Sequence, residues 1–432
     1  MRTLLCACGH LFDAPPGPAI CPVCHQVHPL TLATIRVECV CGAVLKAPGR
    51  LAGKSAKCPK CGTELRVPES EPVALAAAGV AMEAPSLPPP TPPARGVRRY
   101  LPWLFALTLL PLVMSLFTPD DDVEARLHRT FEANPEVAAR EDKEEFKSVD
   151  DVLMALPEHR IEGAFLPRDT KTHWVFAGLA AAALWGAILL LYPLGNASSA
   201  QLWKIGIFTG TIGILLLLGI QYVAIWTQGM ILTGRGIIVV LFWILKFIGF
   251  SYRAALDPEN GFFLSMVGFT FGVGFCEELC KAIPLIWHYR RKATLNLAGA
   301  MAWGLATGVG FGVSEGITYS SDFYNGIHTG SIYVIRFVSC VALHAVWSAA
   351  SAIFIYRRQQ EFRDVESWYE WFIPALKVLW VSMVLHGLYD TLLKRDMEIW
   401  AVLAAAASFA WFFWFADRSL RAEAAEAATA TA

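Results

Sequence analysis

The chain has 432 residues, of which 55% are hydrophobic and 17% are charged, and its formal net charge is −1. Soluble proteins carry roughly 25% charged residues, so the composition excludes an ordinary soluble enzyme. The near-neutral charge says nothing about partners, and nucleic acid is not expected among them. Apolar runs of about 20 residues, long enough to cross a bilayer as helices, recur from Leu101 to Phe415. The sequence therefore predicts an all-α polytopic membrane protein in contact with a lipid bilayer.

Two cysteine modules precede the first apolar run. Each has a C-x-C pair, a spacer of 12 or 16 residues, and a C-x-x-C pair. Cysteine pairs on two tight turns can place four thiolates around one tetrahedral zinc ion. A disulfide scaffold is the alternative, but the repeated motif and the lack of an export signal favour zinc. We expect zinc ribbons at 1–30 and 31–68, the first with ligands Cys6, Cys8, Cys21 and Cys24, the second with ligands Cys39, Cys41, Cys58 and Cys61.

Both modules are too small for a core of their own, so bound zinc should supply their folding free energy. We expect them to recruit an unknown cytoplasmic partner. Residues 69–99 form a Pro/Ala-rich linker that is expected to be extended. Arg95, Arg98 and Arg99 end this linker directly before the first predicted span at 100–117.

Residues 118–172 differ from the apolar runs on either side. They hold 15 Asp and Glu against 8 Lys and Arg, with helical patches such as Val149–Leu156. We expect a soluble insert here, followed by a multi-span domain at 173–418 with its core motifs at 261–395, and an Ala-rich tail at 419–432. The apolar runs lie near 101–117, 174–194, 203–226, 236–252, 261–287, 297–320, 331–356, 371–393 and 398–416.

Charge placement predicts the orientation of these runs. Thiolate zinc sites need a reducing compartment, so the N-terminus is expected in the cytoplasm and the insert outside. The basic loops Arg290–Lys292 and Arg357–Arg363 are also expected inside, which requires one run before Arg290 not to cross. The run 236–252 carries Lys246 centrally and an arginine at each flank, as an interfacial or re-entrant helix would. About eight crossings then place both termini in the cytoplasm.

Seven of the ionisable residues inside four consecutive runs stand out as candidates for a site. A central charged side chain costs roughly 2.5–3.5 kcal/mol on insertion scales, so the five carboxylates and ammoniums would cost on the order of 12–18 kcal/mol if unpaired. At 1.5 Å of rise per residue, counted from Arg290, Asn296, Arg357 or Trp371 at one end of each run, five of the groups lie about 20–28 Å deep, in a band about 8 Å tall: Glu277, Glu315, His344, His386 and Asp390. We expect all seven to share a wet pocket that supports hydrolysis. The seven are Glu277, Glu278, Lys281, Glu315, His344, His386 and Asp390.

The spacing of these residues supports a common site. Lys281 follows Glu277 by four positions and Glu278 by three, and Asp390 follows His386 by four, so each set shares one helix face. Glycines precede the glutamate pair and recur along the next run, where they let membrane helices approach closely. Each element alone also fits a structural role, such as a self-neutralising ion pair or a packing histidine. Their common depth favours a functional site.

In order along the chain, the motifs are Glu277-Glu278-x-x-Lys281, Phe311-x-x-x-Glu315, an isolated His344 and His386-x-x-x-Asp390. This series resembles the PrsW family of bacterial intramembrane proteases, within the larger group of CAAX-processing and bacteriocin-processing membrane proteases. The resemblance covers about residues 230–395. It implies a multi-pass protein of the bacterial inner membrane that cuts membrane-anchored substrates, as with an anti-sigma factor, and it carries the family's site over to these seven positions.

Two mechanisms remain open for such a protease. In both, a water activated by Glu277 or Glu278 attacks the peptide bond. In a metal-free version a histidine donates to the oxyanion. In a metal-assisted version a divalent ion, zinc by preference, is held by two histidines and one carboxylate. The candidate metal ligands are His344 and His386 with Asp390 or Glu315 as the third.

Two other classes of function compete with proteolysis. Intramembrane carboxylates and histidines also form the proton relays of coupled transporters or sensors. Transporters usually contain internal repeats of spans, and this sequence has no visible repeat. The other alternative is a catalytically inactive scaffold whose zinc ribbons recruit a partner, which the presence of all seven motif residues disfavours.

Overall fold

The computed structural model describes residues 2–5, 11–14, 19–20, 27–28, 34–38, 41, 44–48, 55–57, 61–66, 103, 105–118, 122–291, 295–365 and 369–431. The chain divides into two compact units, one of Met1–Thr91 with Ala428–Ala432 and one of Pro92–Ala427. The linker expected at 69–99 lies outside the described residues.

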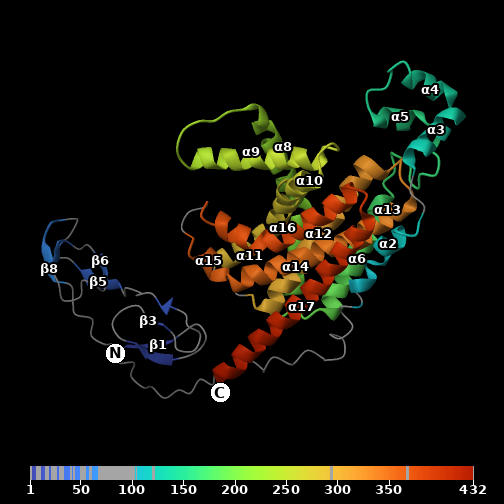
Figure 1. The fold of residues 1–432 in the computed structure, drawn as a ribbon. Helices are drawn as coiled ribbons and strands as arrows, with labels where there is room; N and C mark the ends of the chain where they lie inside the picture. The colour runs from blue at the N-terminus through green and yellow to red at the C-terminus, as the bar shows by residue number, and fades with distance from the viewer. Residues whose placement is uncertain are drawn as a thin grey trace. The chain divides into compact units, whose positions relative to one another are not determined.

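Short antiparallel strand pairs form the described part of residues 1–91 (Figure 1). Along the sequence, each strand pair brackets one cysteine pair of the expected zinc ribbons. Of the eight cysteines, six lie outside the described residues. Cys41 and Cys61 are exposed, and Cys61 Sγ lies 3.2 Å from Thr63 Oγ1, so the zinc sites stay a prediction. The pairs are β1 (Arg2–Leu5) with β2 (Leu11–Ala14), β3 (Ala19–Ile20) with β4 (Val27–His28), β5 (Thr34–Glu38) with β6 (Val44–Pro48), and β7 (Ser55–Lys57) with β8 (Glu64–Arg66).

The described part of the second unit is built from helices. The insert and the segment before it contain α2 (Leu110–Ser115), α3 (Val123–Ala133), α4 (Pro135–Glu141), α5 (Val149–Ala155) and η2 (Pro157–His159). The bundle contains α6 (His173–Leu191), α7 (Ser199–Phe208), η3 (Thr209–Gly213), α8 (Ile214–Trp226), η4 (Thr227–Gly229), α9 (Ile237–Leu256), α10 (Phe262–Gly268), η5 (Phe269–Gly274), α11 (Phe275–Arg290), α12 (Leu297–Tyr319), η6 (Ser320–Tyr324), α13 (Gly330–Val334), η7 (Ile335–Cys340), α14 (Val341–Arg357), α15 (Gln359–Arg363), α16 (Phe372–Lys394) and α17 (Glu398–Thr431).

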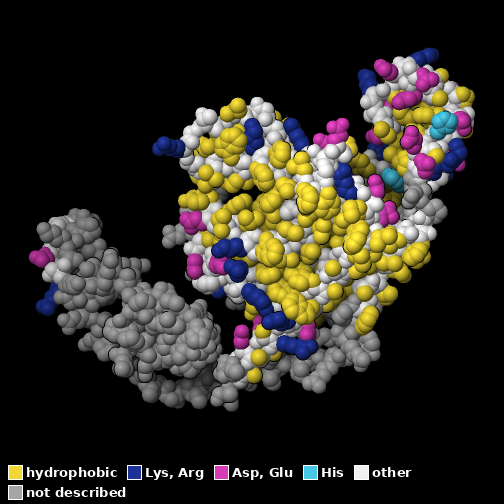
Figure 2. All heavy atoms as spheres, in the orientation of Figure 1, with side chains coloured by type: hydrophobic (Ala, Val, Ile, Leu, Met, Phe, Trp, Pro, Cys, Tyr) yellow, Lys and Arg dark blue, Asp and Glu magenta, His cyan; other side chains and the backbone are white. Residues whose placement is uncertain are grey.

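Within the described residues, eight helical stretches are long and apolar enough to cross a membrane: α6, α7 to η4, α9, α10 to α11, α12 to η6, α13 to α14, α16 and α17. This confirms the predicted membrane class. Figure 2 shows hydrophobic side chains covering the visible face of the bundle, while charged side chains gather on the insert and near the bundle's ends. Two predicted runs come out differently. The described helix of the first run, Phe105–Ser115, is too short to be counted among the eight, whereas the run at 236–252 forms the 20-residue helix α9.

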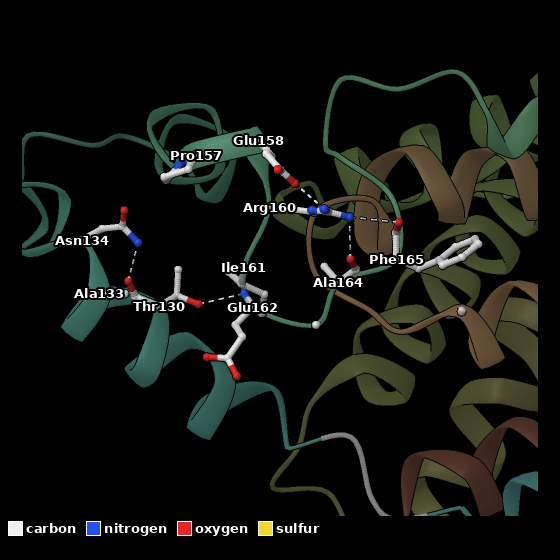
Figure 3. A pocket seen from close by; sticks show the side chains of 12 residues that line it. Thr130, Ala133, Asn134, Pro157, Glu158, Arg160, Ile161, Glu162, Ala164 and Phe165 are labelled. Carbon is white, nitrogen blue, oxygen red and sulfur yellow. Dashed lines mark hydrogen bonds and ion pairs between the residues drawn. The ribbon is translucent and has the colours of Figure 1, made fainter.

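The insert is a small helical fold of its own, with a core of Val137, Leu153, Leu156, Ile161 and Ala164. Its helix α5 confirms the helical patch predicted at 149–156, and Ser148 caps that helix by accepting from Asp151 N. A pocket of about 610 Å³ lies between α3 and residues 157–165. Figure 3 shows hydrogen bonds among the residues that line it, with Glu162 N donating to Thr130 Oγ1 at 2.9 Å. None of the seven predicted site residues lines this pocket.

The insert is joined to the loop between η6 and α13. The Arg126 guanidinium donates to Ile327 O at 2.7 Å, and Ile161 N donates to Gly326 O at 2.9 Å. The insert and this loop must therefore lie on the same side of a membrane, which requires an even number of crossings between them. Five of the eight long apolar stretches lie between them, from α6 to α12. An odd number of the five, and therefore at least one, consequently does not cross.

A second contact narrows the choice. Asn296 N donates to Asn196 Oδ1 at 2.9 Å, so the loops after α6 and before α12 also share a side. Only three stretches separate them: α7 to η4, α9, and α10 to α11. The helix α9 carries Lys246 at its centre, where Lys246 Nζ donates to Met230 O at 2.6 Å, and it is the least buried of the eight. These contacts favour the prediction that the 236–252 run does not cross.

The site helices are held together by glycines. A Cβ on Gly308 of α12 would lie 2.3 Å from His344 O, and one on Gly304 would lie 2.5 Å from the Cα of Ala349, so α12 and α14 pack backbone to backbone. Two π-helical turns lie directly before site helices: η5 leads into α11 and η7 leads into α14. Such wide turns often occur at functional sites because they shift the register of the side chains that follow.

Candidate functional site

The predicted glutamate and lysine motif occupies the first two turns of α11, where all three side chains are buried. Lys281 Nζ lies 2.7 Å from Glu278 Oε1 and 3.6 Å from Glu277 Oε2. It also lies 2.8 Å from His344 Nδ1 on α14. One ammonium therefore faces two carboxylates and one imidazole, which explains how the charge is tolerated inside a bundle.

The two glutamates differ in their surroundings. The side chain of Glu278 is fully buried and pairs closely with Lys281, and its Oε1 also lies 3.3 Å from His386 Nδ1. Glu277 Oε2 lies 3.6–3.8 Å from Lys281 Nζ, His344 Nδ1 and His386 Nε2, and, like Glu278 Oε2, it has no hydrogen-bond partner among the described residues. These distances exceed a hydrogen bond. A buried carboxylate oxygen thus faces three nitrogens beyond hydrogen-bond distance.

Both ring nitrogens of His344 lie close to a charged side chain. Lys281 Nζ has only hydrogens to offer, so His344 Nδ1 accepts, and the ring proton belongs on Nε2. His344 Nε2 lies 2.7 Å from Glu315 Oε2 on α12. The other oxygen, Glu315 Oε1, lies 2.6 Å from Arg336 Nη2 in η7. Three spans thus meet at this histidine.

His386 on α16 completes the cluster. Its Nε2 lies 3.5 Å from Asp390 Oδ2, one helical turn onward, and its ring is 5.3 Å from that of His344. The indole of Trp347 stacks on the His386 ring at 4.6 Å with an interplanar angle of 22°. A Cβ on Gly274 would lie 3.4 Å from the Cβ of His386, so the small residue lets α16 approach α11. The ring is consequently fixed from several sides.

Exposure indicates where the cluster can be reached. The side chains of Glu277 and His344 are 5% and 4% exposed, whereas that of Asp390 is 23% exposed. Glu315 and Arg336, at 12% and 14%, lie between these extremes. Asp390 therefore forms the most exposed edge of the cluster among these five side chains, and His344 lies deep within it.

The cluster contains a donor set suited to a metal ion. Glu277, His344 and His386 each offer one ligand atom, and these three atoms lie within 4.8 Å of one another. Glu277 Oε2 lies 3.8 Å from His344 Nδ1 and 3.7 Å from His386 Nε2. Tetrahedral zinc, with bonds of about 2.1 Å, needs ligand atoms about 3.4 Å apart, close to the 3.7 and 3.8 Å observed from Glu277 Oε2. The carboxylate oxygen without a hydrogen bond supports this fit. If an ion were bound there, His344 Nδ1 would be its ligand instead of accepting from Lys281. Lys281 would still pair with Glu278.

Most of this network was predicted, but not all of it. The structure brings all seven predicted residues together. The expected third metal ligand was Asp390 or Glu315, whereas the carboxylate grouped with both histidines is that of Glu277. Sequence reasoning missed Arg336 and Trp347. Arg336 could have been found as an arginine within a predicted span, because such a charge needs a partner. Trp347, an aromatic among many, gives no such indication.

Comparison with known proteins agrees with the geometry. No curated protein and no solved structure matches the chain significantly. Residues 223–416 match the profile of a family described as PrsW family intramembrane metalloprotease. The matched range contains all seven residues of the cluster and excludes the insert and the cysteine modules. The match supports an intramembrane protease in general, and residues 223–416 of this chain are similar to that family.

Proposed function

We propose that this protein hydrolyses peptide bonds of membrane-anchored proteins within the membrane, with Glu277 as the general base. The observation that carries the proposal is the buried Glu277 Oε2, which faces His344 and His386 without a hydrogen bond. A carboxylate in this setting can take a proton from water. Glu278 is held by Lys281 and is less free to do so.

Each residue has a part in the proposed reaction. Water attacks the carbonyl carbon while Glu277 takes its proton and passes it to the leaving amine as the C–N bond breaks. His386, oriented by Asp390 and by the Trp347 stack, donates to the developing oxyanion. Lys281 and Glu278 neutralise each other and fix the base beside them.

A metal-assisted version uses the same pocket. Glu277, His344 and His386 would hold the ion, which would polarise the carbonyl as a Lewis acid. Glu315 would accept from His344 Nε2 and so keep Nδ1 available as a ligand. In this version Glu277 is a ligand, so Glu278, next to Lys281 and His386, is the carboxylate on α11 that could act as the general base.

The cellular setting belongs to the proposal. We infer a multi-pass protein of the bacterial inner membrane with both termini in the cytoplasm, on charge placement and the eight cysteines. Those cysteines would hold two structural zinc ions, each bound between paired strands, and the modules would recruit a cytoplasmic partner. An anti-sigma-factor-like protein with a single span is the substrate class that the family resemblance suggests.

The test is cleavage of single-span substrates by the purified full chain, with Glu277→Gln and Glu278→Gln as variants. The amide keeps the shape of the carboxylate but cannot take a proton, so Glu277→Gln should lower turnover at least a hundredfold at normal protein level. Glu370→Gln is the control, because that exposed residue lies outside the cluster. A parallel series with a chelator separates the two versions, since only the metal-assisted one loses turnover. Cleavage by Glu277→Gln at the wild-type rate would refute the proposal.

A further inference from the structure

Arg336 is a partly buried cation that neither the motifs nor the proposed reaction uses. It lies in η7, within the stretch from α13 to α14 that is long enough to span a membrane, and its side chain is 14% exposed. An arginine at such a position is expensive unless it is paired, and paired arginines inside a membrane usually serve a function. Its partners are therefore informative.

The partners of Arg336 point to one residue of the site. Arg336 Nη2 lies 2.6 Å from Glu315 Oε1, and the guanidinium lies over the Tyr319 ring at 4.0 Å from its centre. Glu315 and Tyr319 are four positions apart on α12, so one helix face holds the guanidinium from two directions. A planar guanidinium packed on a ring cannot swing away as a lysine could. The Glu315 carboxylate is thereby fixed at one of its oxygens.

The second oxygen of Glu315 carries this constraint to the histidine. Glu315 Oε2 lies 2.7 Å from His344 Nε2, while Lys281 Nζ lies 2.8 Å from His344 Nδ1. A carboxylate on Nε2 keeps the proton there and keeps Nδ1 as the acceptor that faces Glu277. If Glu315 were free to rotate, the ring could turn or exchange its proton between nitrogens. The sequence of contacts runs from Arg336 through Glu315 to His344.

We propose that Arg336 is a positioning residue, which fixes the Glu315 carboxylate and through it the tautomer and orientation of His344. This inference rests on the proposed function, because it assigns Arg336 a part in the same site. Arg336 itself need not touch the substrate. Its effect passes through Glu315 alone, and this distinguishes it from an oxyanion donor or a substrate-binding residue.

The experiment is a double-mutant cycle with Arg336→Ala, Glu315→Gln and the combined variant, measured as turnover and KM on a single-span substrate. Arg336→Ala should lower kcat about 10–100-fold, the usual effect of removing a partner of a site residue, with KM changed less than about twofold. In the Glu315→Gln background the same change should add less than about twofold, because coupled residues do not act additively. Added guanidinium ion should restore part of the activity of Arg336→Ala.

Two further variants keep the test decisive. Arg336→Lys retains the charge but loses the planar fork, so it should insert normally and still have a lowered kcat. Arg126→Ala is the matched control, because Arg126 is a buried arginine that joins the insert to Ile327 O outside the site. It should lower protein level and activity in parallel and gain nothing from guanidinium.

The outcomes separate this inference from the function beneath it. If Arg336→Ala and Arg336→Lys turn over at the wild-type rate while Glu277→Gln is inactive, the positioning role is wrong and the protease remains. Additive losses in the cycle, or an effect on KM alone, would also overturn the role. If Glu277→Gln cleaves normally, the proposed function fails regardless of Arg336.

Discussion

At the scale of residues, Lys281 is the charge on which the cluster depends. Its ammonium is 1% exposed and lies against two buried carboxylates. Taking the ion pair out of water is unfavourable by itself, so the pair is weak evidence for stability. Removal of one partner is different, because it leaves the other charge buried and uncompensated. Lys281 therefore matters to folding whether or not it takes part in catalysis.

The change Lys281→Met should lower the free energy of unfolding by about 3–5 kcal/mol, because Glu278 would be left without its cation. Lys377→Met is the matched control, since that lysine is 52% exposed and lies 3.5 Å from Glu361. It should change stability by less than about 0.5 kcal/mol. Denaturant titration in detergent, followed by tryptophan fluorescence, measures both. Equal stability of the two variants would mean that Lys281 is not the counter-charge of Glu278.

The sequence was informative about these residues for a physical reason. Charges inside apolar runs are costly, so they are few and conspicuous, and helix geometry alone places Glu277 and Lys281 on one helix face. The direction of each side chain was not predictable. That Glu277 rather than Asp390 or Glu315 groups with both histidines depends on how α11 and α16 are rotated. Arg336 was overlooked because it lies six residues into its stretch, where a charge resembles an interfacial anchor.

At the scale of elements, the approach of α12 to α14 sets the distance between Glu315 and His344. Glycines 304, 308 and 312 form one row on α12, and a Cβ on the last would lie 2.9 Å from the Cδ2 of His344. Backbone contact of this kind has no flexible side chain to absorb a change. The geometry of the site is therefore as sensitive to small residues on α12 as to the ionisable ones.

We expect Gly308→Ala to push α12 and α14 apart, because its methyl group would meet His344 O at 2.3 Å and the Cα of Ala345 at 2.4 Å. Overpacking of this kind typically costs about 1–3 kcal/mol, and turnover should fall with it. The control is Gly178→Ala on α6, where nothing lies within 4 Å. That change should be neutral or stabilise the helix by about 0.5–1 kcal/mol. Thermal unfolding and cleavage rates of both variants test this prediction. A Gly308→Ala variant with wild-type stability and cleavage rate would contradict the packing argument.

The predicted runs match the described helices closely, since length and hydrophobicity largely determine a membrane helix. The π-helical turns were not predictable. Nothing in Phe269–Gly274 or Ile335–Cys340 distinguishes a hydrogen bond to the fifth residue from one to the fourth. Tertiary packing selects these turns. The periodicity of an ideal α-helix consequently misplaces side chains on the two sides of each turn.

At the scale of the whole molecule, contacts between loops, rather than hydrophobicity, determine whether the number of membrane crossings between two segments is even or odd. The insert meets Ile327, and Asn196 meets Asn296, so at least one stretch between Asn196 and Asn296 does not cross. Hydropathy alone could not identify it, because α9 is as apolar as its neighbours. From the sequence, the positions of the basic loops also require that one run before Arg290 does not cross the membrane.

Cysteine labelling of intact cells tests this arrangement. One cysteine at a time is placed at Ser148, Arg235, Glu259 or Arg291, in a chain in which Cys276, Cys280 and Cys340 have been replaced. If α9 does not cross, Arg235 and Glu259 should label from the same side as Ser148. Arg291 should label from the opposite side. Labelling of Arg235 and Glu259 from opposite sides would show that α9 spans the membrane.

The contact between the insert and the loop after η6 also has a consequence for biosynthesis. Arg126 and its acceptor Ile327 are 201 residues apart in the chain. At about 5–20 residues per second, the ribosome needs roughly 10–40 s to make the distance between them. During that interval the insert has left the ribosome without the loop that completes it. The insert can therefore dock only if the intervening helices cross the membrane an even number of times. In a chain inserted with the wrong number of crossings, the insert would stay incompletely folded and exposed to quality-control proteases.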